Sequence, residues 1–214
     1  MTVQDIMTRK VVAIGPDMPI TDVHKLMEQR NIRHFPILEP DGEGAGPGRL
    51  VGIVSDRDIR VVGGTHPQSP AGVKMDSPVS MIMIRNVLTA HPLDPIEESA
   101  RVLREHKIGA MPVLEGDELV GIVTGIDFLD ALVAMTGVNR PSSRLEVEVP
   151  NRPGALAALL DRVASLNHNV SSVFATERHE DSITFVLRVE TIHGHRLAAE
   201  LREMNYHVIW PGGN

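Results

Sequence analysis

The chain of 214 residues contains an internal duplication, which restricts its fold more strongly than its composition does. Val3-Gln4-Asp5-Ile6-Met7 is echoed 76 positions later by Val79-Ser80-Met81-Ile82-Met83. After Glu39 the first copy carries extra residues, and Leu50–Ser55 then matches Leu119–Thr124 at a shift of 69. A match of this length with a single gap predicts two structurally equivalent units.

Each copy carries the same order of apolar patterns, which predicts a β-α-β-β-α unit. Such a unit has a small sheet with uncovered apolar faces, so the two copies are expected to stack against each other. The Gly-rich segment 40–48 of the first copy is expected to be a hairpin loop at the surface, with a loop that covers a phosphate as the alternative. The predicted elements are 11–14, a helix from Pro19, 35–38, 50–54 and 56–62 in copy one, and 87–90, 95–106, 110–114, 119–123 and 125–135 in copy two.

Composition and missing motifs exclude several classes of function. The chain has no Cys, which excludes disulfides and thiolate metal sites. No secretory signal and no apolar run of membrane length is visible, so a cytoplasmic protein without a membrane partner is expected. A net charge of −7 and 3% aromatic residues argue against nucleic acid as a partner. Without a nucleophile elbow, a phosphate-binding P-loop or a metal-ligand cluster, we expect no enzyme, no catalytic residue and no metal.

A shared motif closes both copies. It stands as Gly52-Ile53-Val54-Ser55-Asp56-Arg57-Asp58 and as Gly121-Ile122-Val123-Thr124-Gly125-Ile126-Asp127. This pattern, found twice in register, resembles the CBS domain, and the resemblance covers residues 1 to about 136. It implies a tandem pair with two clefts that take AMP, ADP, ATP or S-adenosylmethionine as a regulatory ligand and not as a catalytic cofactor.

The motif has a chemical reason. A hydroxyl and free backbone N–H groups at a strand-to-helix turn can hold a phosphate, and an ionised Asp can accept two hydrogen bonds from ribose. The same residues at the same spacing would also cap a helix, so clefts without ligand remain the alternative. Carried over by position, the first site would use Val12, Ala13, Phe35, Pro36, Ser55 and Asp58, and the second Leu88, Thr89, Met111, Pro112, Thr124 and Asp127.

The two predicted sites differ in charge. Copy one adds Arg57, Arg33 and His34, whereas copy two has Ile126, Gly109 and Ala110 at those places. A polyphosphate is therefore expected on the Arg57 side. Family sequences often have Thr where Ala13 stands, which weakens the first site, whereas Thr89 fits the pattern.

The last third of the chain has a different pattern. Residues 137–143 predict a linker, and the segment from 144 predicts the order β-α-β-β-α-β, which is the ferredoxin-like arrangement. The turn Asn151-Arg152-Pro153-Gly154-Ala155-Leu156 resembles the ACT domain, over about residues 144–210. ACT domains pair side by side, and many bind an amino acid near this turn. The resemblance implies Asn151, Pro153, Gly154, Ala155 and Leu156 as ligand contacts; a domain that only dimerises is the alternative.

These patterns together predict an α/β (α+β) protein made of tandem CBS repeats and a ferredoxin-like ACT domain. Its expected parts are repeat 1 (1–62), a linker (63–78), repeat 2 (79–136), a linker (137–143) and the ACT domain (144–214). This domain order resembles the acetoin-utilisation protein B type of regulator.

Three functions follow from this reading. The first is a homodimeric sensor that binds an adenine nucleotide, and an amino acid at the ACT domain, and signals to a regulated protein whose identity the sequence does not give. The alternatives are a scaffold that only oligomerises, with empty clefts, and a small enzyme acting on a nucleotide.

Overall fold

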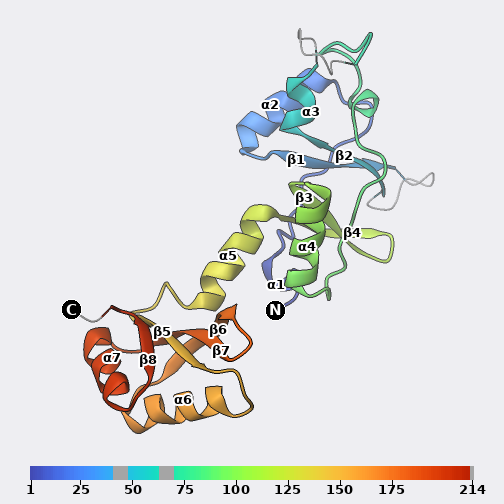
Figure 1. Ribbon diagram of the computed structural model, residues 1–214. Helices are drawn as coiled ribbons and strands as arrows, with labels where there is room; N and C mark the ends of the chain where they lie inside the picture. The colour runs from blue at the N-terminus through green and yellow to red at the C-terminus, as the bar shows by residue number, and fades with distance from the viewer. Residues whose placement is uncertain (41–47, 63–69, 213–214) are drawn as a thin grey trace. The chain divides into compact units, whose positions relative to one another are not determined.

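The computed structural model describes residues 1–40, 48–62 and 70–212 (Figure 1). Most of the Gly-rich loop of the first copy and part of the predicted linker 63–78 lie outside the described residues. The chain divides into two compact units, Met1–Phe128 and the residues from Leu129 onward. Within the described ranges, no helix combines the length and the apolar content that crossing a membrane requires.

The first unit contains the first copy of the repeat and the second copy up to Phe128, whereas the rest of α5 (Gly125–Thr136) belongs to the second unit. Each copy is built around an antiparallel strand pair, β1 with β2 and β3 with β4, and each pair has a register shift at the equivalent place. The predicted strands and helices that follow the first short segment of each copy are confirmed. The elements are α1 (Val3–Ile6), α2 (Ile20–Arg30), β1 (His34–Glu39), β2 (Arg49–Ser55), α3 (Asp56–Arg60), the 3-10 turn η1 (Val79–Met81), α4 (Ile96–His106), β3 (Ala110–Glu115), β4 (Glu118–Thr124) and α5 (Gly125–Thr136).

The predicted first strand of each copy is shorter than expected. Only Ile14 pairs with Ile37, and only Ala90 pairs with Val113, each as a single parallel bridge. Pro36 and Pro112 lie next to these contacts in β1 and β3, and a proline has no N–H to donate to a neighbouring strand. The pairing therefore stops after one residue.

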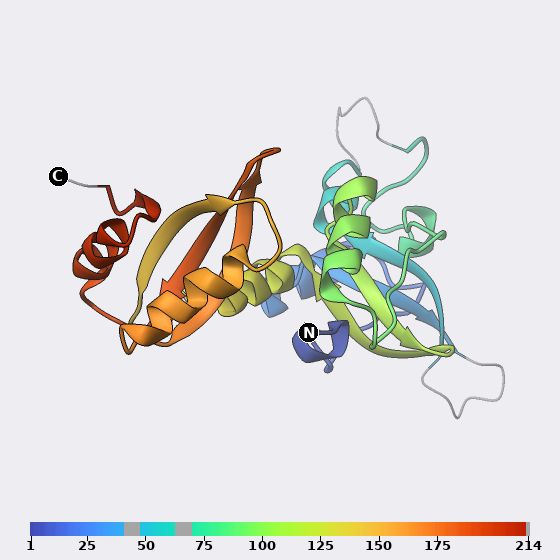
Figure 2. The ribbon, with the colours of Figure 1, turned by 60° about the horizontal axis from the view of Figure 1, so that its bottom comes forward.

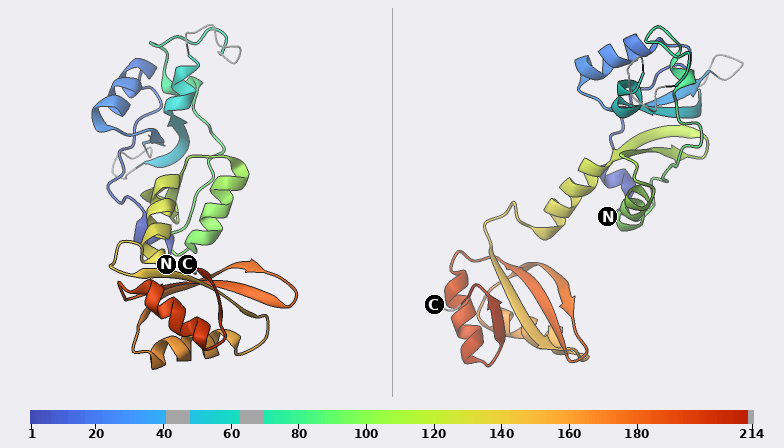
Figure 3. Two further views of the ribbon diagram at one scale, coloured as in Figure 1. Left: turned by 60° about the vertical axis from the view of Figure 1, so that its left-hand side comes forward. Right: turned by 45° about the horizontal axis from the view of Figure 1, so that its top comes forward.

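The two copies exchange their leading segments, so that each core contains residues from the start of the other copy. Val3 and Met7, at the chain's beginning, are buried in the core of the second copy, whereas Val79 and Met83 are buried in the core of the first. Figures 1 and 3 show α1 beside the green elements of the second copy and far from the blue α2. Backbone pairing of Ile53 with Ile84, and of Thr8 with Ile122, extends each strand pair on the outer side of β2 and β4.

The glycine that opens each motif makes this exchange sterically possible. A Cβ on Gly52 would stand 2.6 Å from Sδ of Met83, and a Cβ on Gly121 would collide with Sδ of Met7. The methionine of the exchanged segment therefore occupies the space that a side chain on β2 or β4 would fill. The exchanged segment can pack here because the motif residue is glycine, and a larger residue at Gly52 or Gly121 would displace the methionine.

The second unit has the β-α-β-β-α-β order that the sequence predicts. Its antiparallel sheet runs β6-β7-β5-β8, which is the ferredoxin-like strand order. Leu159, Leu187 and Leu201 are fully buried between the sheet and its two helices, which cover the same face (Figure 2). The elements are β5 (Ser143–Pro150), α6 (Ala155–Ser165), β6 (Val170–Arg178), β7 (Ser182–Val189), α7 (Gly194–Glu203) and β8 (His207–Trp210).

Candidate functional site

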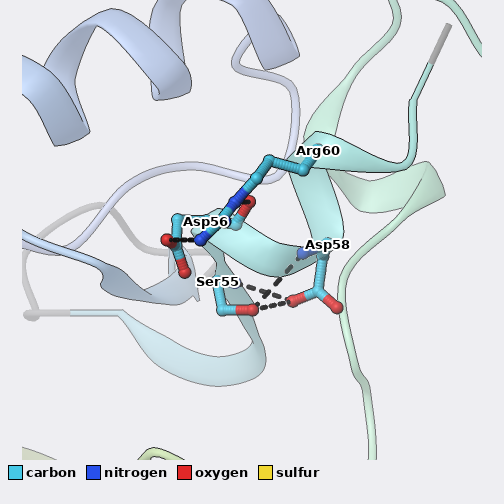
Figure 4. Close-up of polar contacts among 4 residues, drawn as sticks. All are labelled: Ser55, Asp56, Asp58 and Arg60. Atoms are coloured by element: carbon cyan, nitrogen blue, oxygen red, sulfur yellow. Dashed lines mark hydrogen bonds and ion pairs between the residues drawn. The ribbon is translucent and has the colours of Figure 1, made fainter. Parts of the chain in front are cut away.

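The turn from β2 into α3 brings the first motif's hydroxyl and carboxylate together (Figure 4). The N–H and Oγ of Ser55 both donate to Oδ2 of Asp58, at 2.8 and 2.6 Å, and the N–H of Asp58 donates back to Oγ at 3.4 Å. This reciprocal pattern is a capping box, which satisfies backbone donors that the first helical turn leaves free. The same bonds hold the Asp58 carboxylate in one orientation.

The second motif repeats the two hydrogen bonds to the carboxylate. The N–H and Oγ1 of Thr124 both donate to Oδ2 of Asp127, each at 2.7 Å. In both turns the contacts use one carboxylate oxygen, and no described residue donates to Oδ1 of Asp58 or Asp127. Each half-buried carboxylate therefore keeps one acceptor oxygen for another molecule.

A cleft of about 940 Å³ lies beside the first motif and is lined by both copies of the repeat. The first copy contributes Ser55 and Asp58, and the second contributes Ala110 and the segment around Leu88. A cleft of this size is within the range that holds a nucleotide-sized molecule. The wall opposite the motif is therefore supplied by the other repeat.

The sequence assigned each set of site residues to a single repeat, whereas residues of both repeats line the first cleft. Arg33, His34, Ser55, Arg57 and Asp58 line the first cleft, and so do Leu88, which the sequence placed in the second set, and Ala110. The other residues of the first predicted set, Val12, Ala13, Phe35 and Pro36, are not among its lining residues.

Strand alternation explains this result for Phe35. Successive side chains on a strand point to opposite faces, so His34 faces the cleft while Phe35 is fully buried in the core. Met111 has the equivalent place in the second copy and is 1% exposed. Pro112 is also buried, Thr89 is exposed, and Thr124 and Asp127 are half-buried.

Several residues that line the cleft were missed in the sequence. Ile84 and Asn86 come from the exchanged segment, and Lys107 ends α4 in a left-handed conformation at φ 54°. Asp56 and Arg60 complete the turn on the motif's own helix. The register of the duplication assigns each of these positions an equivalent in the other copy. It does not show which cleft, or which copy, a residue faces in the folded chain.

Positive charge dominates the rim of the cleft. Arg33, Arg57, Arg60 and Lys107 line it, together with the carboxylates of Asp56 and Asp58. Arg60 forms an ion pair with Asp56, one turn away on α3 (Figure 4). Within the described part of the chain, Arg33, Arg57 and Lys107 have no ion-pair partner.

His34 lines this cleft, and its pKa departs from the ordinary value of a histidine. Burial lowers its pKa from the ordinary value of 6.5, and the nearby carboxylates of Asp56 and Asp58 oppose that effect. The charge of Arg33 lowers the pKa further. The imidazole is therefore biased toward its neutral form, in which one ring nitrogen donates and the other accepts.

The turn after β5 in the second unit is the other predicted site. Asn151 Nδ2 donates to the carbonyls of His179 and Glu180 at 3.0 and 3.4 Å, so its side chain holds the β6–β7 hairpin. Gly154 has φ 83° and no heavy atom within 4 Å of the place where a Cβ would stand. Pro153 is exposed, and Ala155 and Leu156 begin α6 half-buried.

Two equivalent α/β repeats that exchange segments around a common cleft define a tandem-repeat module. The CBS domain family model matches residues 3–62 and 79–134, which is more than half of the chain. The chain belongs to the CBS domain family.

Individual relatives agree with this assignment. The chain is 30% identical over 122 residues to the CBS domain-containing protein YhcV of Bacillus subtilis, a match that covers 57% of this chain and 79% of YhcV. Several longer curated relatives have enzyme names, and the matches cover only 22% to 37% of their length.

Two solved structures resemble the CBS pair. One is a protein of Vibrio cholerae assigned to acetoin utilization, AcuB, with 31% identity and a TM-score of 0.53, covering 65% of this chain and 95% of that one. The other is the CBS domain pair of protein MJ0100 in complex with 5'-methylthioadenosine and S-adenosyl-L-methionine. It shares 28% identity and a TM-score of 0.51, covering 63% of this chain and 97% of that one.

Proposed function

We propose that the chain is a regulatory protein that senses an adenine nucleotide or a related adenosine compound, bound in the first cleft. The observation that carries this proposal is the half-buried Asp58 carboxylate, held by Ser55 at the edge of a 940 Å³ cleft with Oδ1 unengaged by the described residues. The adenosine ligands in the MJ0100 structure support the same ligand class.

Different residues that line the cleft match different parts of such a ligand. Asp58 accepts from the ribose hydroxyls, which is the task that a fixed carboxylate performs best. The apolar side chains of Ile53, Ile84 and Val87 provide a surface for the flat purine. Thr124 and Asp127 would act in the same way at the second motif.

Signalling requires that the ligand prefers one arrangement of the two repeats. A ligand in the first cleft touches both copies, so its binding free energy depends on how they are oriented. A 100-fold preference for one arrangement shifts the equilibrium by about 2.7 kcal/mol. The protein then acts in the cytoplasm on a partner protein rather than as a catalyst.

The second unit adds a further part to this proposal. Its ferredoxin-like order and the Asn151–Gly154 turn fit an ACT domain, with CBS repeats over 1–62 and 79–136 and the ACT domain over 144–214. Such a domain would pair with a second copy and bind an amino acid beside Gly154. Similarity to AcuB supports a role in acetoin or related carbon metabolism.

One observation favours a second function. Both motif carboxylates lie in the first turn of a helix and accept hydrogen bonds from the residue that precedes it, a structural task that needs no ligand. In that case the repeats form a scaffold that oligomerises and does not sense.

Titration calorimetry separates these functions. AMP, ADP, ATP and S-adenosylmethionine are titrated into the full chain, and at least one is expected to bind. Asp58→Asn keeps an oxygen that can cap α3 but removes the negative charge, and it should weaken binding without loss of fold. Asp76→Ala, an exposed site in the same unit, is the matched control. Absence of binding by all four at millimolar concentration would contradict nucleotide sensing and favour the scaffold.

A further inference from the structure

We propose that a second pocket, at the opposite end of β2 from the nucleotide cleft, binds a small zwitterion, namely an α-amino acid with an apolar side chain. Asp17 takes the ammonium group and Arg85 takes the carboxylate. This inference goes beyond the proposed function, because the pocket and the first cleft have no lining residue in common.

The pocket has a volume of about 500 Å³, which is within the range of small-molecule sites. Its walls come from the start of β2, from the turn before α2 and from the exchanged segment that begins the second copy. The N–H of Ser80 donates to the carbonyl of Pro16 at 3.0 Å, and the N–H of Val79 donates to that of Met18 at 2.9 Å. These bonds fix the exchanged segment against the turn before α2.

The exchanged segment separates this pocket from the nucleotide cleft. Ile84 pairs with Ile53 of β2, and successive side chains of such an extended segment point to opposite sides. Ile84 and Asn86 accordingly line the first cleft, whereas Met83 and Arg85 line the second pocket. Each site can therefore hold its own ligand at the same time.

The charged groups of the pocket match a molecule that carries both signs. Arg49 forms an ion pair with Glu39 at 3.4 Å. In the part of the chain that the structure describes, Asp17 and Arg85 have no ion-pair partner, so one carboxylate and one guanidinium remain. A simple anion is repelled by Asp17 and a simple cation by Arg85, whereas a zwitterion is attracted to both.

Arg85 is held in place and still has donors for a ligand. Its Nη2 donates to the carbonyl of Ser80 at 3.2 Å, which leaves the other guanidinium N–H groups for a carboxylate. The equivalent residue of the first copy, Arg9, donates in the same way to the carbonyl of Gln4 at 3.0 Å. This hydrogen bond is therefore a structural contact of both copies.

The other charges belong to the first copy alone. In the register of the duplication, Asp17 corresponds to Leu93 and Arg49 to Glu118. Both copies nevertheless have the same strand pairing with the same register shift. Neither Asp17 nor Arg49 is therefore needed to build a repeat, and binding of a ligand is a reason for both.

Apolar side chains lie beside these charges. Met83 is buried, and Leu50 and Val51 are half-buried, whereas Asp17 and Arg85 are exposed. An apolar side chain of the ligand can pack on the first three while its charged groups stay at the surface. Because contacts between exposed charges are weak, the expected affinity is millimolar.

Calorimetry on the full chain tests this proposal, with leucine, valine and methionine as probes. At least one is expected to bind at millimolar concentration. Two analogues of leucine carry a single charge: isocaproate lacks the ammonium group and isoamylamine lacks the carboxylate. Each should bind about threefold or more weakly than leucine. Saturating ATP should leave the affinity for leucine unchanged.

Two variants locate the ligand. Asp17→Asn should weaken leucine about threefold and leave isocaproate unchanged, and Arg85→Gln should weaken leucine about threefold and leave isoamylamine unchanged. Asp76→Asn, at an exposed carboxylate of the same unit, and Arg9→Gln, at the repeat equivalent of Arg85, are the matched controls and should leave leucine binding unchanged. Circular dichroism melts check that each variant is folded.

Four results would overturn this proposal. The first two are no binding by any of the three amino acids at tens of millimolar, and single-charge analogues that bind as tightly as leucine. The third is a leucine affinity that both variants leave unchanged, which would place the amino acid elsewhere, such as the turn at Gly154. The fourth is displacement of leucine by ATP, which would place it in the first cleft. Nucleotide binding is measured separately, so the proposed function can fail or stand independently.

Discussion

The imidazole of His34, in the first repeat, lies directly over Gly109 of the second. A Cβ built on Gly109 would stand 2.7 Å from Nε2 of His34, closer than side chains pack. The carbonyl of Gly109 in turn accepts a hydrogen bond from the N–H of Gly125, the first residue of α5. One side chain of the first cleft therefore contacts the backbone that supports the second motif.

Gly109→Ala should force the His34 ring out of its place. We expect the free energy of unfolding to fall by about 1–2 kcal/mol, as for other overpacked contacts. In a His34→Ala background the same substitution should cost almost nothing, because its steric partner is gone. Urea unfolding of the four proteins gives the coupling directly. Additive losses in the double variant would show that the contact does not exist.

His34 should also make stability depend on pH. Burial lowers its pKa below 6.5, so between 6.5 and that lower value the unfolded chain binds a proton that the folded chain rejects. The free energy of unfolding should therefore fall as the pH drops below 6.5, whereas above 6.5 His34 should have no effect. Urea unfolding at several pH values should show this loss reduced in His34→Gln. Parallel pH profiles for the two proteins would contradict the assignment.

The motif glycines should be needed for the exchange of segments. Gly52→Ala places a Cβ 2.6 Å from Met83 Sδ and 3.2 Å from the carbonyl oxygen of Ile84, in a buried region. We expect a loss of about 1–3 kcal/mol. Gly125→Ala is the control, since nothing lies within 4 Å of its Cβ, and its stability should be unchanged or up to about 1 kcal/mol higher. Thermal unfolding distinguishes the two, and equal melting temperatures would refute the packing argument.

The exchange also predicts which repeat each leading segment stabilises. Val3 and Val79 are both fully buried, Val3 in the core of the second copy and Val79 in that of the first. Val3→Ala should cost about 2 kcal/mol and lower amide protection in β3 and β4 more than in β1 and β2. Val79→Ala should do the reverse. Hydrogen exchange measured strand by strand checks both, and loss of protection in the variant's own copy would be evidence against exchange.

Much of the fold could be predicted because local patterns determine it. The spacing of Ile20, Val23 and Met27 predicts a helix with one buried face, and all three are buried on α2. The exchange could not be predicted in this way, since Val3 and Val79 have equivalent places in the repeat and either copy could receive them. The tertiary packing shows the arrangement, for example in the contacts of Met7 and Met83 with the motif glycines of the opposite copies.

The same reason limits what the sequence says about the site. Ser55 and Asp58 could be placed at one turn from the sequence because they lie three residues apart, whether they bind a ligand or cap the helix. Lys107 reaches the same cleft through the stacking of two repeats, and nothing in its local sequence signals that. The charge difference between Arg57 and Ile126 was visible in the sequence, but its meaning depends on the wall that the second copy supplies.

The most direct test of nucleotide sensing is the position of the ribose in a crystal of the full chain grown with ADP. The account predicts that the ribose hydroxyls lie within hydrogen-bond distance of Oδ1 of Asp58, with the phosphates toward Arg57 and Lys107. Well-ordered crystals in which Asp58 contacts only the Ser55 turn, with ADP absent or bound elsewhere on the chain, would contradict it.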